Sequence, residues 1–220
     1  MNPVLKRVLT GLTVAAAVVA AIVFCPRQAL APVFALVFLL AAVEYHQLLV
    51  RKVRAFSASW LSLFVPGVLL LALAFVALPH IAYRHGNLMM LYVIALVKFS
   101  DTGGFAFGLT SARLMKGGNH KLCPTVSPGK SWEGLLGSLV FSSAVSCACM
   151  GWTGFGVGKA LAFGVTAALV GTFGDLVESK FKRWVGVKDS STWKFTNGMG
   201  GLLDMFDSLL FAPAVLYPFI

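Results

Sequence analysis

The sequence carries very little charge. Only 12% of its 220 residues are Asp, Glu, Lys or Arg, whereas 58% are hydrophobic, and the mean hydropathy is +0.85. A water-soluble domain needs a more polar surface than this composition provides. The composition therefore excludes a soluble domain and indicates a helical membrane protein.

Cysteine and histidine are also scarce, with four of each in the chain. Cys147 and Cys149 are two residues apart, so they would point to different sides of a helix. Cys123 lies in a loop without a partner at metal-binding spacing, and the histidines show no such spacing either. These residues indicate neither a disulfide framework nor a zinc site, and we expect the cysteines to be small buried apolar residues.

Acidic residues are the rarest charged class, since eight Asp and Glu stand against eighteen Lys and Arg. In a membrane protein, excess Lys and Arg is typical of cytoplasmic loops beside anionic lipid headgroups. We therefore expect the lipid bilayer, and not nucleic acid, to be the partner of this positive charge.

Apolar segments of nearly constant length follow one another along the chain. Each is near the length that crosses roughly 30 Å of hydrocarbon as a helix. The pattern predicts an all-α, polytopic membrane bundle of about seven transmembrane helices. The segments are about Val4–Phe24, Ala29–Val50, Ser57–Leu78, Leu88–Gly108, Trp132–Trp152, Val157–Val177 and Leu203–Phe219.

The first segment follows Lys6 and Arg7, as a signal peptide would, but it has no clear small-residue cleavage site before Arg27. We expect it to be a retained helix.

The basic residues predict the orientation. With the N-terminus in the cytoplasm, fourteen of the eighteen fall on the inner side, which fits the positive-inside rule. The two longest polar loops, 109–131 and 178–202, then share the cytoplasmic side. We expect a multi-pass protein of the cell inner membrane, with N-terminal helices in 1–86 and a catalytic core in 87–220.

Acidic residues concentrate near the C-terminus, where five of the eight carboxylates lie between residues 174 and 208. Ionisable groups at membrane depth are costly and usually face a polar cavity. Asp204 and Asp207 are three residues apart, so they project to one side of a helix. Helix capping explains one such acid more easily than two.

Asp175, Asp204 and Asp207 are therefore predicted to bind a metal ion. Magnesium suits this set, because it prefers hard oxygen ligands and takes further oxygens from phosphates and water. The preceding glycines, Gly198, Gly200 and Gly201, would let backbone N–H groups approach a phosphate. Glu178 receives no role.

The loop 109–131 leads into a second candidate site. Gly129-Lys130-Ser131 matches the end of a P-loop, but Pro124 stands where the earlier glycine is required, which excludes that motif. Hydroxyls, a lysine and a helix N-terminus could still hold phosphate. The residues concerned are Ser127, Lys130, Ser131 and Glu133. A capped helix beside interfacial lysines explains the same residues.

Three polar groups leave alternatives open. Lys98 and Asp101 are three apart in the fourth segment, so they could pair with each other or serve a site. Glu44 could be a buried structural carboxylate. His120, beside Lys121, could contact phosphate or lie on the surface.

Four sequence blocks then occur in a recognisable order. They are SDTGGFAFG at 100–108, NHKLCPTVSPGKSWEG at 119–134, GDLVESKFKR at 174–183 and GMGGLLDMFDS at 198–208. From about Lys98 to the C-terminus the chain resembles the phosphatidate cytidylyltransferase family. The family pattern is matched by Ser179, Lys182, Arg183, Lys188, Asp189, Asp204 and Asp207. Met199 and Met205 stand where the family has His and Arg.

The resemblance implies transfer of a cytidylyl group from CTP to phosphatidate, which forms CDP-diacylglycerol and pyrophosphate in phospholipid biosynthesis with Mg²⁺ as cofactor. It also suggests a homodimer. The catalytic set would be Asp175, Asp204, Asp207, Lys130, Lys182 and Arg183. The substrate pocket would be formed by Asp101, Ser127, Ser131, Glu133, Ser179, Lys188, Asp189, Gly198, Gly200 and Gly201.

Two other functions fit the same sequence. One is a CTP-dependent polyprenol or phytol kinase, which would transfer the γ-phosphoryl group to an alcohol. The other is a non-catalytic membrane homologue, which Met199 and Met205 favour because methionine cannot donate a proton or a hydrogen bond to phosphate.

Overall fold

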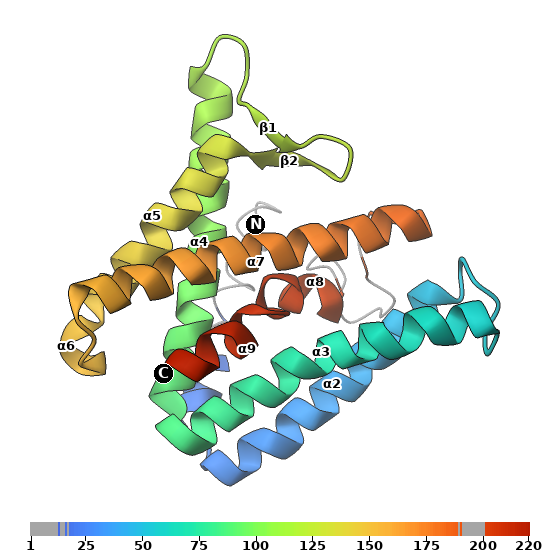
Figure 1. Cartoon of the computed structure of the whole chain (residues 1–220), viewed down its shortest axis with the longest axis horizontal. Helices are drawn as coiled ribbons and strands as arrows, with labels where there is room; N and C mark the ends of the chain where they lie inside the picture. The colour runs from blue at the N-terminus through green and yellow to red at the C-terminus, as the bar shows by residue number, and fades with distance from the viewer. Residues whose placement is uncertain (1–12, 14–15, 17, 189, 191–200) are drawn as a thin grey trace. The chain divides into compact units, whose positions relative to one another are not determined.

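The computed structural model describes residues 13, 16, 18–188, 190 and 201–220. These residues form helices and a single two-stranded β-hairpin (Figure 1). The chain divides into two compact units. The first comprises Met1–Leu91 with Asp189–Met205, and the second comprises Tyr92–Lys188 with Phe206–Ile220.

The first unit is built on a helical hairpin of α2 (Arg27–Leu49) and α3 (Ala58–His85). Aromatic rings link the two helices, with Phe38 and Phe75 5.9 Å apart and His46 and Trp60 5.5 Å apart between ring centroids. Leucines on the facing sides are fully buried. The turn that follows α3 is held by Asn87, whose amide donates to the carbonyls of Ile22 and Cys25 at 2.6 and 2.9 Å.

The second unit contains most of α4 (Asn87–Leu114), then α5 (Trp132–Ala148), the short α6 (Met150–Thr153) and α7 (Val157–Val185). Polar contacts join α4 to α5. The hydroxyls of Tyr92 and Ser146 are 2.6 Å apart, and Ser138 donates to the carbonyl of Ser100 at 2.9 Å. Small polar residues of this kind let membrane helices pack closely.

The hairpin of the second unit joins β1 (Lys121–Cys123) to β2 (Ser127–Ser131), antiparallel, with Lys121 opposite Ser131. It leads directly into α5, because the Ser131 hydroxyl caps that helix by accepting from the Gly134 N–H at 3.0 Å. Figure 1 shows the hairpin where α4 ends and α5 begins. The expected helix start at Ser131 is confirmed.

The C-terminal stretch is a series of short helices. They are α8 (Leu202–Phe206), η2 (Asp207–Leu209), α9 (Ala212–Leu216) and η3 (Tyr217–Phe219). The Asp207 carboxylate accepts from the Ser208 N–H, and Pro213 and Pro218 lack the N–H that a continuous helix requires. The segment predicted at Leu203–Phe219 is confirmed as long and apolar enough to cross a membrane, but it is divided into these short helices and is not one continuous α-helix.

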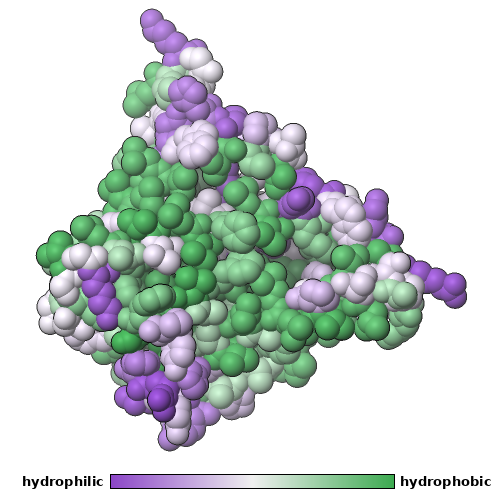
Figure 2. Space-filling model, viewed as in Figure 1, coloured by the Kyte–Doolittle hydropathy of each residue, from purple (hydrophilic) through white to green (hydrophobic). Residues whose placement is uncertain are grey.

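The membrane assignment agrees with the structure. Among the described residues, five helical stretches are long and apolar enough to cross a membrane. They are Arg27–Leu49, Ala58–His85, Asn87–Leu114, Val157–Val185 and Leu202–Phe219. Apolar side chains cover much of the visible surface (Figure 2), as expected for helices in contact with lipid. The chain is a helical membrane protein, while the count of seven spans and the cytoplasmic N-terminus stay predictions.

Several expected boundaries need correction. The segment Trp132–Trp152 is divided at Cys149 into α5 and α6, and α5 is not among the five stretches above. The loop 109–131 begins as the last turns of α4 and ends as the hairpin. The loop 178–202 begins inside α7, which stops only at Gly186 in the left-handed conformation. Most of Val4–Phe24 lies outside the described residues.

Candidate functional site

One side of α7 carries four polar residues. Asp175, Glu178, Ser179 and Lys182 are spaced at i, i+3, i+4 and i+7, which places them on one face of the helix. The last three of these residues are buried. A row of buried polar groups on an apolar helix is costly unless the groups pair with one another or serve a site.

Three carboxylates meet at this face. Asp175, Glu178 and Asp207 each offer an oxygen, and these oxygens lie within 4.8 Å of one another. Asp207 reaches α7 because Gly174 has no side chain, and a Cβ there would overlap the Asp207 carbonyl. Like charges this close repel strongly unless cations compensate them. We call these three residues the carboxylate cluster.

Two lysines provide part of this compensation. The Lys130 ammonium, from β2, lies 2.5 Å from Asp175 Oδ2, and the Lys182 ammonium lies 2.6 Å from Glu178 Oε2. Ser179 adds a hydrogen bond to Asp175 Oδ1 at 3.1 Å. The Glu178 and Lys182 side chains are only 4% and 11% exposed, and their pairing offsets part of the cost of burying both charges.

A second polar group lies where α4 meets η2. The Ser208 hydroxyl donates to Asp101 Oδ2 at 2.8 Å and accepts from the Lys98 ammonium at 3.1 Å. Lys98 and Asp101 also form the expected ion pair, with 3.4 Å between Nζ and Oδ2. Since Ser208 follows Asp207 directly, this network fixes the backbone beside the carboxylate cluster.

The hairpin is attached to the end of α7 by Arg183. Its guanidinium donates to the carbonyls of Val126 and Val187 at 3.4 and 3.2 Å. Ser131 caps α5, as described above, and Ser127 lies opposite Cys123 in the hairpin. Together with the ion pair between Lys130 and Asp175, these contacts hold the hairpin against α7 (Figure 1).

Glu133 pairs with His120. The Glu133 Oε1 atom is 2.6 Å from His120 Nδ1 and also accepts from the His120 N–H at 3.2 Å. The hydrogen bond from the His120 side chain is the largest of the effects that lower the pKa of Glu133 from 4.5 to about 2. Glu133 is therefore ionised at neutral pH, and it cannot serve as a proton donor there.

Asp204 and Gly201 belong to the first unit. Asp204 Oδ2 accepts from the N–H groups of Ser190 and Gly201, both at 2.9 Å, so the carboxylate caps the start of α8. Glu44 Oε2 accepts from the Leu203 N–H, also at 2.9 Å. Glu44 is fully buried, and a Cβ on Gly201 would overlap its carboxylate.

The structure thus brings together part of the predicted site. Asp175, Asp207, Lys130 and Lys182 lie at one place in the second unit, while Asp204 caps a helix in the first, and its role as a metal ligand stays a prediction. Lys188 is exposed, three residues beyond the end of α7. Three residues predicted to line the substrate pocket, Asp189, Gly198 and Gly200, lie outside the described residues, as does Met199.

Sequence reasoning missed Glu178, which the structure places in the carboxylate cluster. The signal was present, because Glu178 follows Asp175 by three residues and precedes Lys182 by four. The contact of Lys98 with Ser208 was also missed, and no sequence spacing indicates it.

Comparison with known proteins points to one family. The model of the cytidylyltransferase family matches residues 51–220. A phosphatidate cytidylyltransferase of Staphylococcus aureus (strain COL) is 42% identical over 129 residues, covering 58% of this chain and 46% of that protein. The enzyme of that name from Haemophilus influenzae is 39% identical over 165 residues, covering 70% and 52%. The chain spans about half the length of the curated relatives it matches.

Proposed function

Because the chain belongs to the cytidylyltransferase family, we propose that it transfers a cytidylyl group from CTP to phosphatidate. The products are CDP-diacylglycerol and pyrophosphate. The observation that supports this function best is the carboxylate cluster with Lys130 and Lys182 beside it, on helices that suit a membrane. Such a site combines metal ligands with cations that bind phosphate.

The reaction needs little from a general base. A phosphate oxygen of phosphatidate attacks the α-phosphorus of CTP, one P–O bond forms, and the bond to the β-phosphate breaks to release pyrophosphate. A phosphate monoester dianion is already nucleophilic. Catalysis then depends on positioning and on compensation of negative charge, as in other phosphoryl transfers.

The carboxylate cluster fits magnesium. Asp175, Glu178 and Asp207 offer hard oxygen ligands within a small space, and the ion takes its remaining ligands from phosphates and water. Bound there, Mg²⁺ supplies positive charge that stabilises the phosphates during transfer.

The lysines and the hairpin would bind the nucleotide. Lys130 and Lys182 carry positive charge beside the cluster, and Arg183 fixes the hairpin that carries Lys130. Asp101 and Ser179 would position their neighbours, Ser208 and Asp175. For Asp204 we propose a role as the cap of α8 in place of the metal ligand predicted from the sequence. The remaining predicted residues keep their roles: Ser127, Ser131, Glu133, Lys188, Asp189, Gly198, Gly200 and Gly201.

We place the protein in the cell inner membrane, with this site on the cytoplasmic side, where CTP is available. The distribution of basic residues supports that orientation. A homodimer remains part of the proposal through the family resemblance.

The test uses the purified full chain with Mg²⁺ and CTP labelled at the α-phosphorus. With phosphatidate, the expected products are CDP-diacylglycerol, which carries the label, and unlabelled pyrophosphate. Formation of CDP with a prenol or phytol would identify a kinase instead. Absence of turnover with both acceptors, in protein that still binds CTP, would identify a non-catalytic homologue.

A matched pair of variants links the activity to the site. Asp207→Asn removes one charge of the carboxylate cluster and is expected to abolish turnover. Arg84→Gln removes a charge at the end of α3, in the first unit, and is expected to leave turnover unchanged. Equal activity in both variants would contradict the assignment of the site.

A further inference from the structure

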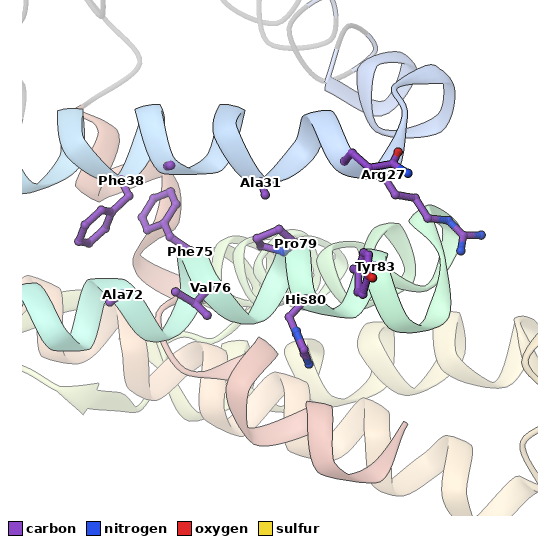
Figure 3. Close-up of a pocket in the computed structure, with 11 residues that line it drawn as sticks. Arg27, Ala31, Phe38, Ala72, Phe75, Val76, Pro79, His80 and Tyr83 are labelled. Atoms are coloured by element: carbon purple, nitrogen blue, oxygen red, sulfur yellow. The ribbon is translucent and has the colours of Figure 1, made fainter.

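A groove runs between α2 and α3 in the first unit (Figure 3). Its volume is about 580 Å³, and its walls are almost entirely apolar. Three alanines, Ala31, Ala35 and Ala72, leave the space open because their side chains are small. At one end the rings of Phe38 and Phe75 close it, with 5.9 Å between their centroids.

The other end of the groove is polar. Arg27 and Gln28 from α2 and His80 and Tyr83 from α3 line it, and Figure 3 shows Arg27 and Tyr83 at the opposite end from the phenylalanines. Arg27 is exposed, and Arg84 adds a second positive charge to the same end of α3.

No acidic side chain of these helices balances this charge. The sequence has no Asp or Glu before Glu44, and none between Glu44 and Asp101. Glu44 lies near the other end of α2, where it accepts from the Leu203 N–H. The polar end of the groove is therefore complementary to an anion that the two helices do not supply.

The length of the groove also restricts its occupant. From Arg27 to Phe38 the helix advances eleven residues, or about 16 Å at the usual rise. One leaflet of a bilayer contributes about 15 Å of hydrocarbon. The groove thus begins at a cationic end and extends through about the depth of one leaflet. Its charge matches the phosphate of a phospholipid, and its length matches an acyl chain.

We propose that this groove binds one acyl chain of an anionic phospholipid, with the lipid phosphate at Arg27. The apolar walls take the chain, and the guanidinium takes the headgroup. The loop at the opposite end of the helical hairpin carries Arg51, Lys52 and Arg54, which the positive-inside rule assigns to the cytoplasm. The bound lipid therefore belongs to the outer leaflet and is a structural ligand, separate from the phosphatidate of the proposed reaction.

The test measures lipids retained by the purified full chain, using native mass spectrometry with added dioleoyl phosphatidylglycerol or dioleoyl phosphatidylcholine. Ala35→Trp fills the groove and is expected to reduce retention of both lipids. Leu36→Trp is the matched control, since Leu36 is 59% exposed and does not line the groove. Arg27→Gln is expected to lower the preference for phosphatidylglycerol about fivefold and to leave phosphatidylcholine unchanged.

Equal lipid retention by Ala35→Trp and Leu36→Trp would overturn the proposal. So would a change in the ratio of monomer to dimer in Ala35→Trp without loss of lipid, because a second copy of the chain would then be the occupant. An unchanged lipid preference in Arg27→Gln would contradict the assignment of the headgroup to Arg27. Because this variant alters an exposed side chain, it tests the proposal even if a tryptophan variant fails to fold.

Discussion

Lys130 Nζ lies 2.5 Å from Asp175 Oδ2, and this ion pair joins the β-hairpin to the polar face of α7. The two side chains are about one quarter exposed, at 23% and 29%, so water reaches the pair from one side. Lys130 lies in β2, just before α5, and Asp175 lies within α7, forty-five residues later. The contact therefore brings together, from separate elements, a lysine that we propose binds phosphate and an acid that we propose binds a metal ion.

Lys130→Met is expected to weaken binding of CTP about ten- to a hundredfold, because it removes a charged hydrogen-bond donor worth about 1.5–3 kcal/mol. Isothermal titration calorimetry on the detergent-solubilised protein measures the change. The control is Lys121→Met, which removes an exposed lysine from the neighbouring strand. If the two variants weaken CTP binding equally, the effect is one of overall charge, and a specific role of Lys130 is excluded.

Glu178→Gln is expected to destabilise the protein by about 3–5 kcal/mol, because it removes the negative charge that lies 2.6 Å from the buried Lys182 ammonium. The double variant Glu178→Gln with Lys182→Met should recover most of this loss, since neither charge remains. Thermal unfolding followed by circular dichroism measures both changes. Turnover should stay low in the double variant, because the carboxylate cluster is incomplete. Recovery of turnover together with stability would show that Glu178 serves structure alone.

Asp207 and Asp204 can be separated by their effects on metal binding. Asp207→Asn should abolish the rise in melting temperature that Mg²⁺ produces, since a ligand that binds only the folded state stabilises it. Asp204→Ala should retain the rise in melting temperature that Mg²⁺ produces. It should lower the free energy of unfolding of the metal-free protein by about 1–3 kcal/mol, because two backbone N–H groups lose their acceptor. The reverse result would restore Asp204 to the metal site predicted from the sequence.

Gly201→Ala is expected to destabilise the first unit by about 1–3 kcal/mol, as an extra methyl group does in a filled core. The added Cβ would overlap the carboxylate of Glu44 and the hydroxyl of Ser190. In a Glu44→Ala background the further cost of Gly201→Ala should be smaller, because only the overlap with Ser190 remains, and a double-mutant cycle of unfolding free energies measures the difference. Additive costs would show that the two residues do not interact.

The sequence by itself determined the class of the protein and the region of its chemistry. Apolar segments of membrane length predict helices, because the hydrocarbon core admits only backbones that satisfy their own hydrogen bonds. The concentration of acids between residues 174 and 208 indicates a site, because charge is too costly in such a chain without a use. The Lys98–Asp101 pair and the cap at Ser131 were also predictable, since both depend on residues within one helical turn.

Only the tertiary structure decided which acids meet. Spacing along a helix cannot distinguish Asp204 from Asp207. In the structure the Asp204 carboxylate accepts from the amides of Ser190 and Gly201. Asp207 instead packs against Gly174 and lies beside Asp175 and Glu178. The breaks near the C-terminus and the attachment of the hairpin to α7 likewise depend on contacts between residues far apart in the chain. Local sequence patterns determine where helices form and which charged residues are costly to bury. Packing between residues far apart in the chain determines which partner compensates each charge.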